Sequence, residues 1–186
     1  MPARPFFSAL KPTPTFFLQT PITPVMDNLR DLLVHSLQDM YSAETQALRA
    51  MPLMAEATQN AALRRAMEQH MKETERQVQR LEQVAQAMGV QAQGEECAAM
   101  KGLIEEATKF MEEDATPEVA DAGLIAMSQK MEHYEIACYG SAIAWCRQLG
   151  EMECAQMLEE TLLEEKATDM KLTQLAENRV NEQAAG

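Results

Sequence analysis

Apolar residues recur at alternating steps of three and four along four long segments, which is the period of an amphipathic helix. The first stripe opens after Asp27, a candidate N-cap, and continues past Pro52, so we expect a kink there and not an end. Gly89 and Gly150 supply stops for the second and third segments. The predicted helices span about 27–58, 60–88, 116–149 and 151–177.

The connections between these helices differ in length. The first and third links, near Thr58 and Gly150, are short and predict antiparallel hairpins. The link from Val90 to Thr116 is long, and its pattern predicts a short helix at about 97–113. At about 1.5 Å per helical residue, a link of this length can return along the whole bundle. We therefore predict an all-α, ferritin-like four-helix bundle with a long crossover carrying a short extra helix.

Residues 1–25 differ in composition from the rest, with six of the eight prolines, four of the five phenylalanines and no acidic residue. The prolines exclude a continuous helix and interrupt the apolar core that a signal peptide needs. We expect residues 1–25 to be a disordered or non-native N-terminal tail, with Met26 as an alternative start. The bundle should then cover 26–180, followed by a frayed end at 181–186.

The charge and residue composition of the chain indicate which classes of partner to expect. The net charge of −13 repels phosphate backbones and anionic lipid, so we expect neither nucleic acid nor a membrane as partner. The four cysteines show no C-x-x-C spacing, which favours free thiols in a reducing cytoplasm, although an even number leaves disulfides open. Apolar residues beside the core stripe, such as Ile136 and Ile143, leave surface for a second copy, so we expect a homodimer.

Polar residues interrupt all four stripes at similar distances from the turns. They lie 12 to 19 residues from Thr58 or from Gly150, which predicts one layer across the middle of the bundle. Glu135 and Glu165 are equally far from Gly150, whereas Glu164 should lie off the inward line. The candidate metal ligands are Glu44, His70, Glu73, Glu132, Glu135, Glu165 and Asp169.

Six carboxylates and one imidazole that share a core require positive charge, because each desolvated ion costs several kcal/mol. No Lys or Arg occupies the central stripe, so we predict two metal ions. The alternative for any one of these residues is a solvated position at the stripe margin. Tyr41 and Tyr139 are within reach of the layer as hydrogen-bond donors, while His35 and His133 fit surface or packing roles better than ligation.

Four blocks carry a family resemblance over essentially all of 26–177. They are LRDLLVHSLQDMYSAETQAL, HMKETERQVQRLE, DAGLIAMSQKMEHYEIACYG and TLLEEKATDMKL. The chain resembles the YciE/YciF family of ferritin-like bacterial stress proteins. The likeness implies a rubrerythrin-related bundle with a dinuclear metal centre, in a protein that is dimeric. It implies ligand roles for Glu44 and for the pair Glu132 and Glu135.

Two departures from the ferritin-like Glu-x-x-His order change the expected metal. His70 precedes Glu73, and no histidine follows Glu165 by three, so Asp169 is the nearest replacement for the second histidine. This oxygen-rich set suits hard ions, so iron is the first choice and manganese the second. We expect a stress protein that reacts with O2 or peroxide or handles iron, with an unknown electron donor. The alternative is a non-catalytic acidic bundle with an interaction or structural role.

Overall fold

The computed structural model describes residues 26–186, and this part of the chain is helical without strands. The helices are α1 (Leu29–Ala57), α2 (Ala61–Ala87), α3 (Ala98–Met111), α4 (Pro117–Leu149), α5 (Met152–Leu175), the π-helical segment η1 (Ala176–Val180) and α6 (Asn181–Ala184). The predicted tail, residues 1–25, lies outside the described residues.

Local sequence signals set the helix ends. Asn28, and not the expected Asp27, caps α1, because its side chain accepts the amide hydrogen of Asp31. Asn60 caps α2 in the same way, and Gly150 ends α4 in the left-handed conformation, with φ of 80°. Pro52 lies inside α1, which continues to Ala57 as predicted. These caps place both short hairpin turns where the sequence indicates them.

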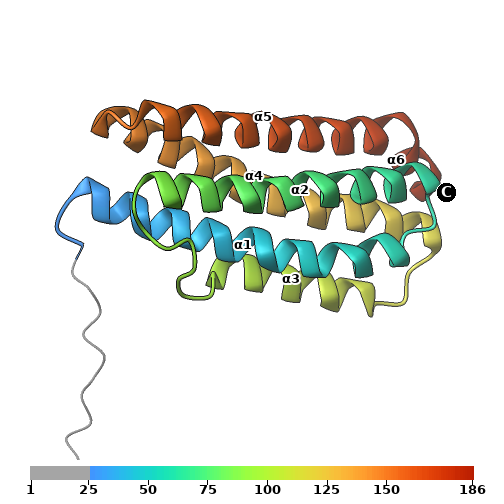
Figure 1. Ribbon diagram of the computed structural model, residues 1–186. Helices are drawn as coiled ribbons and strands as arrows, with labels where there is room; N and C mark the ends of the chain where they lie inside the picture. The colour runs from blue at the N-terminus through green and yellow to red at the C-terminus, as the bar shows by residue number, and fades with distance from the viewer. Residues whose placement is uncertain (1–25) are drawn as a thin grey trace, which may run out of the picture.

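The four long helices form the predicted ferritin-like bundle (Figure 1). The hairpins α1–α2 and α4–α5 are antiparallel, and α2 also packs against α5 while α1 packs against α4. The crossover from Met88 to Thr116 returns along the bundle, and its helix α3 packs against α1 and α4. Every long helix therefore has two long neighbours and one face directed into a shared core.

A strict heptad repeat through Glu135 predicts that Cys138, Trp145 and Leu149 lie on the inward face of α4 with Tyr139 beside it, and the observed inward face differs from this prediction. Glu132 and Tyr139 are buried, whereas Cys138, Trp145 and Leu149 are partly or fully exposed. A strict seven-residue repeat drifts by about 20° per heptad against a straight helix, so over a 33-residue helix the buried face moves to neighbouring positions. Ile143, expected at the surface, is 3% exposed for the same reason and leaves no apolar surface for a partner.

Two hydrophobic clusters lie on either side of a polar layer. The methionine cluster centres on the buried side chains of Met51, Met54, Met67, Met100 and Met131. The leucine cluster centres on Leu33, Leu37, Leu81, Leu158 and Tyr139. Both clusters draw on both hairpins, so the packing of the bundle also positions the polar side chains between them.

The C-terminal end departs from the expectation of fraying after residue 180. The chain passes through the π-helical η1 and a final turn of α-helix, and Val180 is buried in the methionine cluster.

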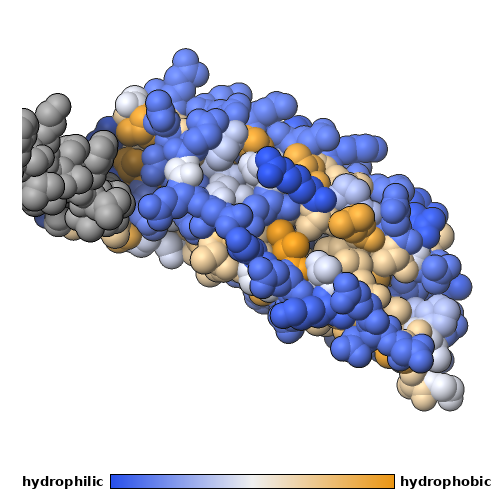
Figure 2. All heavy atoms as spheres, turned by 90° about the horizontal axis from the view of Figure 1, so that it is seen from below, coloured by the Kyte–Doolittle hydropathy of each residue, from blue (hydrophilic) through white to orange (hydrophobic). Residues whose placement is uncertain are grey.

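None of the helices between residues 26 and 186 combines the length and the apolar character that a bilayer span requires. Figure 2 shows the α3 side as mostly hydrophilic with separate apolar patches, in keeping with the net charge of −13.

Candidate metal centre

Three helices bring four buried potential ligands to one point in the polar layer. His70 comes from α2, Glu132 and Glu135 come from α4, and Glu165 comes from α5. One donor atom from each of these residues lies within 4.8 Å of the others. Glu132 and Glu135 are three residues apart, so both project from one face of α4. The group, hereafter the His–Glu cluster, unites four of the seven predicted ligands.

His70 presents one ring nitrogen to the carboxylates and the other to its supports. Its Nε2 lies 3.2 Å from Glu132 Oε1 and 3.7 Å from Glu165 Oε2. Its Nδ1 lies 3.2 Å from the hydroxyl of Thr168 and 3.7 Å from Glu73 Oε2. This arrangement fixes the ring plane and leaves Nε2 as the nitrogen that can bind a metal beside the carboxylates.

Glu44 extends the His–Glu cluster toward the leucine cluster. The hydroxyl of Tyr139 donates a 2.6 Å hydrogen bond to Glu44 Oε1, and both side chains are buried. Burial is the main reason that the pKa of Glu44 rises to about 7, although the Tyr139 hydrogen bond and His70 lower it. Tyr139 therefore has the donor role expected from the sequence, whereas Tyr41 donates to Glu82 at the surface.

Burial and repulsion between the carboxylates together disfavour negative charge at the centre. Burial, and then the neighbouring carboxylates, raise the pKa of Glu135 and of Glu165 well above their ordinary value. For His70, burial is the largest effect and favours the neutral ring, but the carboxylates of Glu132, Glu73 and Glu135 together outweigh it and raise the pKa well above the ordinary value. The protein alone thus stabilises protons here, which a cation can replace.

Buried oxygen atoms at the centre lack partners among the described residues. Glu132 Oε2, Glu135 Oε1 and Glu165 Oε2 are buried and accept no hydrogen bond within residues 26–186. A buried polar atom without a partner costs about 1–3 kcal/mol, and a charged one costs more. Three such oxygens converging beside an imidazole are a donor set that fits a hard or borderline cation.

Two predicted ligands lie outside the His–Glu cluster. Glu73 contacts the Nδ1 side of His70 and is partly exposed, and His70 is the main cause of the lowering of its pKa to about 2. Asp169 accepts a 2.9 Å hydrogen bond from Gln129 and lies 3.4 Å from the exposed His133. The structure therefore places Glu73 as a support of the imidazole and Asp169 at the side of the bundle.

The sequence reasoning overlooked Gln77, Thr168 and Arg80. Gln77 is fully buried, and its amide donates to Glu165 and, at 3.1 Å, to Glu164. Arg80 donates a 2.9 Å hydrogen bond to Glu164, so Glu164 lies off the centre as predicted but is not free. Gln77 falls on the inward stripe of α2, and a neutral polar residue at such a position was the available signal.

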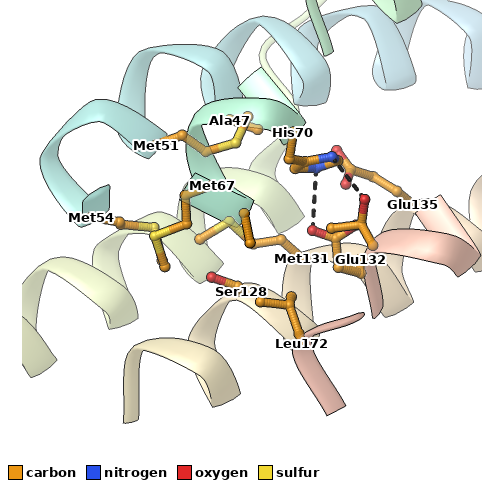
Figure 3. Close-up of a pocket in the computed structure, with 12 residues that line it drawn as sticks. Ala47, Met51, Met54, Met67, His70, Ser128, Met131, Glu132, Glu135 and Leu172 are labelled. Carbon is orange, nitrogen blue, oxygen red and sulfur yellow. Dashed lines mark hydrogen bonds and ion pairs between the residues drawn. The ribbon is translucent and has the colours of Figure 1, made fainter. Parts of the chain in front are cut away.

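A small cavity adjoins the His–Glu cluster on the side of the methionine cluster (Figure 3). It has a volume of about 20 Å³, enough for one water-sized molecule. His70, Glu132 and Glu135 line its polar wall together with Ser128, whereas methionine side chains line much of the rest. The cavity therefore leaves room for a small molecule between the His–Glu cluster and the methionine side chains.

Comparisons with known proteins agree with this architecture. A family model described as a domain of unknown function, DUF892, matches residues 28–185. The chain is 47% identical over 160 residues to Protein YciF of Escherichia coli K12. This match covers 86% of this chain and 96% of that protein. The crystal structure of the E. coli stress protein YciF matches with a TM-score of 0.81 over 84% of this chain and 99% of that one.

Two further solved structures share the fold. YcfI of Rhodopseudomonas palustris, described as a candidate structural protein, is 40% identical, with a TM-score of 0.78 over 85% of this chain and 98% of that one. A protein from Xanthomonas campestris is 26% identical, with a TM-score of 0.66 over 82% of this chain and 94% of that one. The resemblance read from the sequence is thus confirmed along nearly the whole bundle.

Proposed function

Because this chain belongs to the YciE/YciF family (DUF892), we propose that it is a metal-binding stress protein whose His–Glu cluster, with Glu44, holds two metal ions. The observation that carries the proposal is the convergence, beside the imidazole of His70, of three buried carboxylate oxygens that accept no hydrogen bond from residues 26–186. Without cations, these groups repel one another inside the bundle. With cations, each oxygen gains a partner.

The charge of the centre agrees with two divalent ions. Glu44, Glu132, Glu135 and Glu165 contribute four negative charges when ionised, and two divalent cations contribute four positive charges. Iron is our first choice and manganese the second, because the donors are carboxylate oxygens with one imidazole nitrogen. Glu73 and Thr168 would orient His70, while Gln77 would orient Glu165.

We propose that the centre reacts with O2 or peroxide, or stores and releases iron, during stress. The metal ions would supply the redox chemistry. The protein side chains would bind and orient the ions, compensate their charge, and exclude bulk water from the polar layer. Tyr139 would keep Glu44 in place through its hydrogen bond, since both side chains are buried away from solvent.

Elemental analysis of protein purified from iron- and manganese-replete medium tests the proposal. We expect about two metal ions per chain in the wild type and fewer than about one in Glu165→Gln, which keeps the shape but removes a charged ligand. Glu75→Gln is the matched control, because Glu75 is exposed on α2. Wild-type protein without stoichiometric metal, or equal loss in both variants, would refute the metal centre.

The second candidate is a non-catalytic structural role, which the description of the R. palustris relative favours. A metal-free bundle with unchanged stability on chelation would support this alternative. We also propose that the protein is a cytoplasmic homodimer without nucleic-acid or membrane partners, with an electron donor still to be identified. The four free cysteines and the acidic surface support the compartment and the absence of polyanionic partners.

A further inference from the structure

Four methionine side chains face the cavity beside the His–Glu cluster. Met51 and Met54 come from α1, Met67 from α2 and Met131 from α4 (Figure 3). All four are 6% exposed or less, and Glu132 and Ser128 also line the cavity. The cavity therefore has a thioether side and a hydrogen-bonding side around a space for one water-sized molecule.

We propose that these methionines are the reductants of this site: each thioether reduces one hydrogen peroxide molecule at the cavity and becomes a sulfoxide. This inference rests on the proposed metal function, because the centre is what would draw the oxidant to buried sulfurs. In the step, the sulfur lone pair forms an S–O bond while the O–O bond breaks. The departing hydroxide takes the hydrogen of the transferred oxygen and leaves as water.

The step balances without another electron donor. Sulfur loses two electrons and the peroxide gains them, so the products are one sulfoxide and one water. The polar wall can hold the peroxide, since the Ser128 hydroxyl lines the cavity and can both donate and accept hydrogen bonds, and peroxide has two O–H donors. Four thioethers would give each chain a capacity of four peroxide molecules before it needs repair.

Core packing alone does not require thioethers at these positions. Leucine has nearly the same volume and is buried in the leucine cluster at Leu33, Leu37 and Leu158. Methionine differs from leucine in its flexibility and in its oxidisable sulfur. The concentration of methionine on the cavity side therefore indicates chemistry as well as packing.

Peptide mass mapping of sulfoxides after brief peroxide treatment tests the proposal, because the chain contains its own controls. Met152 and Met170 are 60% and 58% exposed, whereas Met40 and Met100 are 1% and 0% exposed but do not line the cavity. In the iron-loaded protein we expect about tenfold more sulfoxide at Met51, Met54, Met67 and Met131 than at Met40 and Met100. We also expect these four to react before the exposed pair, and chelated protein to show the opposite order.

Three outcomes contradict the inference or its basis. If the protein binds iron and oxidises it but only Met152 and Met170 react, the inference is wrong and the proposed function stands. If Met40 and Met100 react as fast as the cavity methionines, oxidation is a general effect of unfolding and the inference is wrong. If the protein binds no metal, the proposed function and this inference fail together.

A volume-conserving variant adds a second readout. Replacing all four cavity methionines by leucine should preserve the helical circular dichroism signal and metal stoichiometry. In the iron-loaded variant we expect peroxide to oxidise the next available side chains, so that oxygen addition on His70 itself increases about threefold or more. Fragmentation spectra separate this addition from oxidation of Met71, which lies on the same peptide. An unchanged oxidation pattern at His70 would show that the thioethers intercept no oxidant.

Discussion

The methionine cluster and the leucine cluster are both formed by the buried faces of helices, but they contact the polar layer between them in different ways. On the leucine side, Tyr139 closes the layer by donating to Glu44 from a fully buried position. On the methionine side, a cavity of about 20 Å³ separates Met131 and Met67 from the carboxylates. One side thus fixes the ligands, and the other side gives a small molecule room to approach them.

The difference follows from side-chain chemistry. Leucine and tyrosine pack in few rotamers and leave little adjustable space, whereas methionine has three rotatable bonds and adapts to irregular gaps. A cavity can therefore persist beside methionine without a rigid wall. A change of residue type in the core therefore lets one bundle hold its ligands rigidly on one side of the polar layer and leave space for a small molecule on the other side.

Truncation in the two clusters should have the largest effects. Leu158→Ala removes a fully buried side chain from the rigid cluster and should lower the free energy of unfolding by about 4–5 kcal/mol. Met67→Ala should cost about 2–3 kcal/mol, since its flexible neighbours can move into the space. Urea denaturation of both variants measures this difference. An equal or larger loss for Met67→Ala would contradict the asymmetry.

Acidification should stabilise the metal-free protein at the polar layer. The pKa of Glu44 is about 7 in the folded chain against an ordinary value of 4.5, so its protonated form favours folding. This contribution is present at low pH and is lost as pH rises from about 4.5 through 7, and the raised pKa of His70 acts in the same direction. We therefore expect the melting temperature of chelated protein to rise as the pH is lowered from 8 to 5.5.

The variant Glu44→Gln provides the control for this pH dependence. It should flatten the profile of the metal-free protein and leave the melting temperature higher at pH 8. Metal-loaded protein should show the reverse trend, because protons compete with cations for the same oxygens. A melting temperature of chelated protein that falls steadily from pH 8 to pH 5.5 would be inconsistent with a buried carboxylate layer.

Removal of the Tyr139 hydroxyl should have a smaller effect. Tyr139→Phe leaves Glu44 without its donor and should lower the free energy of unfolding by about 1–2 kcal/mol at pH 8. Tyr41→Phe removes a comparable hydroxyl that donates to Glu82 at the surface and should change stability by less than about 0.5 kcal/mol. Paired denaturation curves measure both values, and equal effects would show that Tyr139 does not support the ligand.

A change of about 1 kcal/mol or less is expected for Glu164, next to the candidate ligand Glu165. Glu164→Ala should cost about 1 kcal/mol, because it leaves the amide of Gln77 and the guanidinium of Arg80 with one partner fewer. Position alone would place this residue among freely exposed sites, with a cost below about 0.5 kcal/mol. Metal content, measured in the same samples, should remain at the wild-type value.

Helix boundaries and topology could be predicted because short-range signals determine them. Asn60 and Gly150 act within a few residues of their own position, and the long interval between the second and third helices requires a crossover. The buried face of α4 was harder to predict, because a small error in the assumed helical period accumulates over a long helix. This is why Trp145 was expected in the core and Tyr139 was placed beside it.

The acidic ligands of the candidate site could be predicted from the sequence, whereas the residues that orient these ligands were harder to predict. Glu135 and Glu165 are acids on inward stripes and equally far from Gly150, so periodicity alone brings them together. Glu73 and Asp169 lie one helix position away from the inward line, where a small rotation separates ligand from support. Gln77 carries no charge, so a search for acids and imidazoles passes over it, although burial makes its amide a specific partner.

The division of the His–Glu cluster between the two hairpins has a consequence for assembly. The α1–α2 hairpin holds Glu44 and His70, and the α4–α5 hairpin holds Glu132, Glu135 and Glu165. A slip of one helical turn between the hairpins, about 5.4 Å, exceeds the 4.8 Å span of the cluster and would break it apart. A cation shared by both hairpins would therefore select the correct register during folding, and a half-protein consisting of one hairpin would have no complete ligand set to offer.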